Sequence, residues 1–243
     1  SERVKKVLSQ IRLSHPAAEE ARKLLIQWSG QVREGLAPAI FEVFWDRLQE
    51  LTFSDDFRSY YHQIAEYFRV KEAGLERILD KPDSIWFDLK ETQKVETREE
   101  IIEKALLEAP DYLRHKFGRN QEKWDWPSLH RLGYTHVLGQ KWFLGFFNCG
   151  KYPMIGDGTT VRASFSGDGW ETTGGASCRL IVDLSDLDKS LAVITSGQSG
   201  HFMSPHYQDQ ISLYLNSLYH PWAFSEAAVN RVLERTEKLV PQK

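Results

Sequence analysis

Hydrophobic residues recur at helical spacing through the first half of the chain. Ala21, Leu24, Leu25 and Trp28 form one stripe, because side chains three and four positions apart lie on one face of a helix. The same spacing predicts further helices, over residues 39–51, 57–68, 75–79 and 98–117. We therefore expect a helical N-terminal half.

Capping residues predict where the earlier helices begin and end. Ser14 is expected to cap the first long helix, with Pro16 in its first turn and Gly30 as its stop. Ser54, followed by two aspartates, is expected to cap the helix over residues 57–68. These positions divide the first half into short helices joined by loops.

The helix over residues 98–117 has the strongest end signals. Thr97 and Glu100 have the spacing of a capping box, in which each side chain bonds the backbone amide of the other residue. Gly118 is expected to end the helix. Pro110 lies inside it and should kink it or divide it in two, because proline lacks an amide donor and clashes with the preceding turn.

The spacing changes in the second half. Short apolar runs predict strands over residues 159–165, 178–184 and 191–195, the last two buried and joined by a turn at 185–189. Two closing helices follow, one opened by Ser204 and Pro205 and running through Tyr214, the other capped by Ser225 and ending near Leu239. The predicted fold class is α+β, a helical N-terminal half followed by mixed strands and two closing helices.

Charge and glycine are distributed in opposite directions. Of the 65 charged residues, 44 precede Trp124, whereas 12 of the 16 glycines follow it. Dense mixed charge is typical of solvated helices, and glycine-rich sequence is typical of strands and turns. We expect a helical region over residues 1–123 and a strand-rich region over residues 124–243.

Composition excludes several classes of protein. With 41% apolar residues the 243-residue chain can bury a core, and its net charge of −3 provides no basic field for nucleic acid or an anionic membrane. The longest apolar run, residues 142–147, is far below the ~20 residues that span a bilayer. The charged start does not resemble a signal peptide. We expect a soluble globular chain, or an excised piece of one.

The densest polar cluster lies at residues 197–210 and includes Gln198. Ser199 sits in a sequence that misses the nucleophile-elbow pattern by one position, because His201 replaces the final glycine. A serine hydrolase built on Ser199, His206 and Asp209 is one hypothesis. A tight strand-to-helix turn capped by Ser204 is the favoured interpretation.

Metal-binding interpretations of the same half are weak. His201, His206 and Asp209 match no common zinc spacing. The Gly-Asp-Gly sequences at 156–158 and 167–169 lack the carboxylate series of a calcium loop, and we interpret them as hairpin turns. No cofactor is predicted for this chain.

Three other features could carry chemistry. Arg179 interrupts an apolar strand, and a buried guanidinium needs a partner, which Asp157, Asp183 or a segment missing from this chain could supply. Ser1 could be an N-terminal nucleophile, but an exposed amphipathic pattern follows it instead of a buried strand. Cys149 and Cys178 are too few for a disulfide scaffold, and could pair or remain free thiols.

Aromatic side chains crowd the join between the two regions. Trp124, Trp126, His130, Tyr134 and His136 fall within thirteen residues. They could stack a ligand or nucleic-acid bases, but few basic residues lie among them. Core packing is the favoured interpretation.

Taken in order, several short motifs together resemble one family. These motifs are residues 24–30 (LLIQWSG), 85–88 (IWFD), 96–100 (ETREE), 124–130 (WDWPSLH), 156–161 (GDGTTV), 176–186 (ASCRLIVDLSD), the 197–210 cluster and 219–225 (YHPWAFS). The chain resembles the C-terminal part of the β-subunit of the penicillin amidases (penicillin acylases), which are N-terminal-nucleophile hydrolases.

The resemblance implies a fold and an activity. The fold would be part of an αββα sandwich. The enzyme would hydrolyse the amide bond between an acyl side chain and a β-lactam, a homoserine lactone or a related amine, using the serine at the start of the β-subunit. The whole enzyme often binds calcium and is mostly periplasmic or secreted. The partners would be the α-subunit and the N-terminal portion of the β-subunit.

The sequence departs from the family where the nucleophile would stand. The family has a motif like Ser-Asn-x-Trp, whereas Ser1 is followed by Glu2 and Arg3. Ser29, Phe202 and Gln208 also replace residues common in the family. No catalytic residue is carried over. The matched motifs supply structural residues: Arg179, Asp183, Gln198, Ser199, His201, His206 and Asp209.

Two hypotheses follow, from different classes. The first is an acylase fragment that is inactive alone and forms part of the enzyme's structural shell. In that case the apolar run at residues 142–147 would face the missing part, and the isolated chain could self-associate. The second is a stand-alone module that binds a small ligand through the aromatic residues at 124–136.

Overall fold

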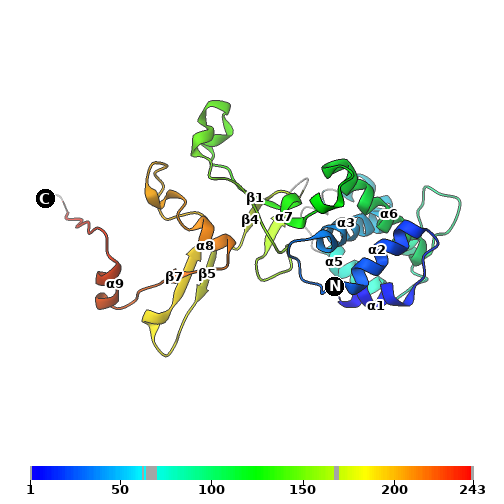
Figure 1. The fold of residues 1–243 in the computed structure, drawn as a ribbon, viewed down its shortest axis with the longest axis horizontal. Coiled ribbons are helices and arrows are strands. Elements are labelled where there is room, and N and C mark those ends of the chain that lie inside the picture. Colours follow the sequence, from blue (N-terminus) through cyan, green and yellow to red (C-terminus); the bar gives the residue numbers. More distant parts are fainter. Residues whose placement is uncertain (1, 62, 64–69, 167–169, 242–243) are drawn as a thin grey trace. The chain divides into compact units, whose positions relative to one another are not determined.

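The computed structural model describes residues 2–61, 63, 70–166 and 170–241. They form two compact units, Ser1–His130 and Arg131–Lys243, shown in Figure 1. The expectation that residues 1–123 and 124–243 are parts of one incomplete domain stays a prediction. In the described part of the chain, no helix combines the length and the apolar character needed to cross a membrane.

Helices build the first unit. They are α1 (Glu2–Gln10), α2 (Pro16–Gln27), α3 (Leu36–Phe57), α5 (Val70–Ile78), α6 (Arg98–Phe117) and α7 (Trp126–Leu129), with 3₁₀ turns η1 (Arg58–Tyr60), η2 (Ile85–Phe87) and η3 (Gln121–Lys123). The long helices α3 and α6 pack side by side (Figure 1). Their facing stripes, including Phe44, Leu48, Ile101 and Leu106, are buried.

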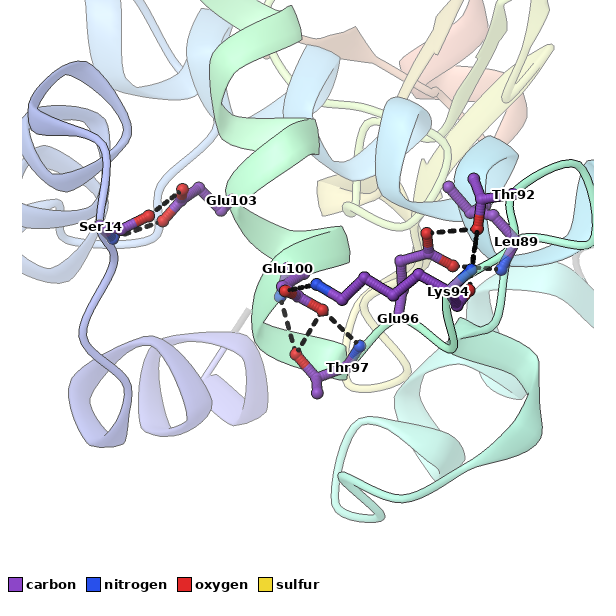
Figure 2. Close-up of polar contacts among 8 residues, drawn as sticks. All are labelled: Ser14, Leu89, Thr92, Lys94, Glu96, Thr97, Glu100 and Glu103. Atoms are coloured by element: carbon purple, nitrogen blue, oxygen red, sulfur yellow. Dashed lines mark hydrogen bonds and ion pairs between the residues drawn. The ribbon is translucent and has the colours of Figure 1, made fainter.

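The capping box of α6 is confirmed. The Thr97 hydroxyl accepts from the Glu100 amide, and the Glu100 carboxylate accepts from the Thr97 amide at 3.0 Å (Figure 2). Gly118 ends the helix with a φ of 82°. Of the two outcomes predicted at Pro110, the division is wrong, because α6 continues through it, and the kink stays a prediction. Burial of the neighbouring Ala109 stabilises a continuous helix despite the lost amide donor.

The predicted cap of α2 is wrong by one residue. His15 is the N-cap, and its Nδ1 accepts from the Ala17 amide at 3.2 Å. The amide and hydroxyl of Ser14 instead donate to the carboxylate of Glu103, 89 positions away in the sequence (Figure 2). A long-range carboxylate therefore removes Ser14 from the role that its local sequence predicts.

Helix α3 also runs further than predicted. It ends at Phe57, so Ser54 lies within it instead of capping a new helix. Phe53 is buried, and its ring centroid lies 5.5 Å from that of Trp86, which stabilises the extra turn. The carboxylate of Asp55 accepts from the Lys90 amide at 2.8 Å. The predicted helix over 57–68 otherwise falls mostly outside the described residues.

Two small sheets build the second unit. The first has the order β2-β1-β4-β3 and the second β5-β6-β7; neighbours are antiparallel except β1 and β4, which are parallel. The strands are β1 (Arg131–Tyr134), β2 (Gly150–Pro153), β3 (Ser164–Ser166), β4 (Thr172–Gly175), β5 (Cys178–Ile181), β6 (Leu191–Ile194) and β7 (His220–Pro221). Leu132, Met154, Val193 and Tyr214 form its buried core. The predicted α+β class is confirmed.

The strand predicted over residues 159–165 is shorter than expected. Only β3 forms, because Oδ1 of Asp157 accepts from the amide and hydroxyl of Thr159 and from the Thr160 amide at 2.6–2.9 Å, which fixes a turn. This turn joins β2 to β3, which lie at opposite edges of their sheet, so it is not a hairpin turn. Residues 167–169, and Ser1, lie outside the described residues.

Strand β5 and the closing helices also differ from expectation. β5 is largely exposed and not buried: it forms an edge of its sheet, and its Leu180 and Ile181 side chains are about half exposed. The first closing helix is split into a 3₁₀ turn, η7 (Pro205–Tyr207), and α8 (Ile211–Leu215). The second, α9 (Glu226–Val232), is capped by Ser225 as predicted but ends well before Leu239.

Candidate functional site

The polar cluster at residues 197–210 forms a closed loop. The Ser199 amide donates to the carbonyl of His206 at 3.1 Å, and the Ser204 hydroxyl accepts from the His206 amide at 3.2 Å. Gly197 lies so close to the returning chain that a Cβ there would be 2.1 Å from the carbonyl oxygen of His206. The predicted tight turn capped by Ser204 is therefore what the structure contains.

Gln210 anchors this loop to the second sheet. Its backbone amide donates to the carbonyl of Ser196, and its buried side-chain oxygen accepts from the backbone amide of Ile194, both at 2.9 Å. A glutamine that satisfies the last amide of β6 holds the two ends of the loop together. Gln210 belonged to the cluster in the sequence, but local spacing gave no sign of this role.

His206 lies between two carboxylates. Its Nδ1 is 2.8 Å from Oδ2 of Asp209, and its Nε2 is 3.0 Å from Oε2 of Glu234. The hydrogen bond that the His206 ring donates to Asp209, and then the one that it donates to Glu234, raises the pKa of the His206 imidazole above its ordinary value. Both ring nitrogens can donate only in the protonated form, so this arrangement favours the imidazolium.

The Asp209→Asn substitution should lower the pKa of His206. In the wild-type protein, stabilisation by charged His206 is fully present below the unfolded-state pKa of about 6.5 and is lost as the pH rises through the higher folded pKa. NMR titration of the histidine side chains measures the pKa of His206 in the wild-type protein and in Asp209→Asn. Asp186→Asn, which removes a carboxylate that does not contact His206, is the control. Equal His206 pKa values in wild type and Asp209→Asn would contradict this assignment.

The structure does not support a triad of Ser199, His206 and Asp209. The ring nitrogen that would take a proton from serine faces Glu234, and the Ser199 hydroxyl accepts from the His201 amide at 3.1 Å. His201 in turn accepts from the Met203 amide through Nδ1. These groups therefore hold the loop together and are not arranged for nucleophilic attack.

No metal site emerges from the described residues. Among them, no group of three His, Cys, Asp or Glu side chains is arranged to hold a metal ion. His206 and Asp209 contact each other, whereas His201 bonds within its own turn. Calcium binding by the whole enzyme, which the resemblance implies, stays a prediction.

Arg179 finds a partner that its sequence did not predict. Its guanidinium carbon lies 3.9 Å from the ring centroid of Tyr214, and Nη2 donates to the Tyr214 carbonyl. An aromatic face and a carbonyl thus replace the expected carboxylate. Asp183 instead accepts from the amide and hydroxyl of Ser185, which lowers the pKa of its carboxyl group.

Sequence reasoning overlooked Asp188. Its carboxylate accepts from the amides of Phe224 and Ser225 and from the Ser225 hydroxyl at 2.6–2.9 Å, and these bonds lower its pKa. Asp188 lies in the turn between β5 and β6, 37 positions before Ser225. No local signal identifies such a contact.

A pocket of about 480 Å³ lies beside the loop within the second unit. Its lining combines backbone, hydroxyl, amide, imidazole and thiol groups from Gly133, Tyr134, Thr135, His136, Gln140, Phe147, Cys149, Ser196, Ser199 and Tyr207. The Tyr207 hydroxyl donates to the Phe147 carbonyl at 2.6 Å, which ties the loop to the 3₁₀ segment η5 (Trp142–Phe147). Burial raises the pKa of the Cys149 thiol, so that group is not activated.

The predicted aromatic cluster divides between the units. Trp124, Trp126 and His130 are buried in the first unit, where the rings of Trp126 and His130 stack with centroids 4.7 Å apart. Tyr134 and His136 belong to the second unit and line its pocket. Trp124, Trp126 and His130 are core residues, as the favoured interpretation predicted.

Comparison with known proteins shows that the chain is similar to acylases. Over 175 residues the chain is 30% identical to the acyl-homoserine lactone acylase QuiP of Pseudomonas aeruginosa (strain PAO1), an alignment covering 66% of this chain and 21% of that protein. It is 28% identical to the penicillin acylase 2 proenzyme of Pseudomonas sp. (strain SE83), covering 92% of this chain and 29% of that protein. The chain thus spans between a fifth and a third of the length of these acylases.

The fold agrees. The whole chain superposes on 46% of the thermostable penicillin G acylase from Alcaligenes faecalis, with a TM-score of 0.51 and 16% sequence identity. Residues 1–231 match the penicillin amidase family. This chain belongs to the penicillin amidase family, and the resemblance in its ordered motifs is confirmed.

Proposed function

We propose that this chain is the C-terminal part of the β-subunit of an acylase and serves as its structural shell. The complete enzyme would hydrolyse the amide bond between an acyl side chain and a β-lactam, a homoserine lactone or a related amine. The names of the relatives, which are acyl-homoserine lactone acylases and a penicillin acylase, support this substrate class. That the chain spans 21–29% of those two relatives supports a role as one part of a larger enzyme.

The bonding of the 197–210 loop is the observation that carries this proposal. Its serine and histidine side chains bond to backbone amides and to carboxylates, so they fix the position of the loop. The group that attacks the substrate carbonyl is then the serine at the start of the β-subunit. The chain's partners are the α-subunit and the N-terminal portion of the β-subunit, in a periplasmic or secreted enzyme.

A small-ligand-binding module is the second candidate. The pocket of about 480 Å³ in the second unit supports it, because Tyr134, His136 and Tyr207 offer aromatic and hydrogen-bonding surface to a small ligand. The buried tryptophans of the first unit, on which this hypothesis first rested, offer no such surface.

Hydrolysis assays separate these functions. With penicillin G and an acyl-homoserine lactone as substrates, we expect no turnover by the chain alone and turnover when it is co-expressed with the remaining part of the acylase. Ser199→Ala should leave the turnover of that complex unchanged. Turnover by the isolated chain that Ser199→Ala abolishes would contradict the proposal, and saturable ligand binding by a stable monomer would favour the second candidate.

A further inference from the structure

Strand β5 is an edge with partly exposed apolar side chains on both faces. It pairs with β6 on one side, and the described residues place no strand on its other side. Leu180 and Ile181 are consecutive, so they point to opposite faces of the sheet, and they are 48% and 51% exposed. Val182 and Leu184, which follow, are 47% and 88% exposed. Leu180 and Ile181 are therefore each about half exposed, one on each face of this edge.

The backbone bonds of β6 show which groups of β5 point outward. The Ile194 amide donates to the Gln210 side chain, and the Ser190 carbonyl accepts from the Trp222 amide. The backbone amides and carbonyls of residues 190, 192 and 194 therefore point away from β5. Opposite residues in an antiparallel pair exchange both of their bonds or neither. Ile194 lies opposite Cys178, and Ala192 lies opposite Leu180. The amides and carbonyls of Cys178 and Leu180 therefore point to the outer edge.

β5 and the residue after it contain no proline, lysine or bulge that would block that edge. Natural sheets protect exposed edges with proline, lysine, bulges or inward charges. Residues 178–182 are Cys-Arg-Leu-Ile-Val, and the charge of Arg179 is held over the Tyr214 ring. Among the described residues, the outward donors and acceptors of this edge have no backbone partner, and an edge of this kind with apolar side chains on both faces is suited to pairing with another strand.

We propose that a strand from the part of the acylase outside this chain pairs with the outer edge of β5, and that elements flanking that strand cover Leu180 and Ile181. This inference rests on the proposed function. The chain spans 21–29% of the acylases compared above, so most of such an enzyme is available to supply the strand. A second copy of β5 would extend the sheet but would bring the same partly exposed apolar side chains.

Hydrogen exchange at individual amides tests the pairing. In the chain alone, the amides of Arg179 and Ile181 should be protected by β6, and the Leu180 amide should exchange freely. In the complex with the remaining part of the acylase, exchange at Leu180 should slow by about tenfold or more. If the complex forms and Leu180 still exchanges freely, this inference fails and the proposed function stands. If no complex forms, both fail.

A pair of substitutions at one position isolates the backbone bond. Leu180→Pro removes the outward amide without removing a bond to β6, which edge strands tolerate, and should weaken association by about tenfold or more. Leu180→Ala keeps the amide and should weaken association less. Protected Arg179 and Ile181 amides in Leu180→Pro verify that β5 still pairs with β6. Equal affinities, or concentration-dependent protection of Leu180 in the chain alone, which indicates a second copy, would overturn the inference.

Discussion

Trp126→Ala should lower the free energy of unfolding by about 3–5 kcal/mol. The indole is 1% exposed and stacks on His130 with an interplanar angle of 8°, in a helix that packs against α3. Removing it leaves a large cavity that the surrounding helices cannot fill without moving. Urea unfolding followed by circular dichroism measures the loss.

Trp142→Ala is the matched control for this substitution. Its side chain is 94% exposed, so the same change in side-chain volume should alter stability by less than about 0.5 kcal/mol. An unchanged unfolding free energy in Trp126→Ala would contradict the buried position of this indole. It would also restore ligand stacking as the interpretation of the aromatic cluster.

Gly197→Ala should destabilise the second unit by about 3 kcal/mol or more and open the 197–210 loop. The added Cβ would lie 2.1 Å from the His206 carbonyl oxygen and 2.8 Å from Oδ1 of Asp209. The His206 carbonyl oxygen belongs to the backbone and accepts a hydrogen bond from the Ser199 amide, so it cannot move without breaking that hydrogen bond. Thermal unfolding and amide exchange at Ser199 report the two effects.

Gly200→Ala provides the control in the same loop. No atom lies within 4 Å of a Cβ at that position, so stability should change little. If Gly197→Ala and Gly200→Ala had equal stability, the close return of the chain at His206 would be wrong. A change confined to Gly197→Ala would show that this glycine is required by space and not by its sequence motif.

Local sequence predicted the features that local physics determines. The capping box at Thr97 and Glu100, the end of α6 at Gly118 and the Ser204 cap each depend on residues two to four positions apart, and all three are present. The order of helices and strands followed from spacing for the same reason. These bonds form within one turn of chain, so their geometry is encoded in the sequence that makes them.

Long-range contacts decided the features that sequence could not give. Ser14 donates a hydrogen bond to Glu103, 89 positions away, instead of capping a helix. His206 forms a hydrogen bond with Glu234, 28 positions away. Arg179 lies over Tyr214 and not beside either aspartate named for it. The apolar pattern of β5 predicted a buried strand, but a strand's own sequence does not specify what covers it. In the 197–210 loop, the sequence identified the residues and the structure identified their partners.

The separation of the two cysteines gives the protein a single addressable thiol. Cys149 and Cys178 are both free; the first is buried, which raises the pKa of its thiol, and the second is exposed at the start of β5. A maleimide dye at neutral pH would therefore attach at one position without any engineered residue. That position lies on the proposed seam with the rest of the enzyme, so the colour of an environment-sensitive label would follow assembly in real time.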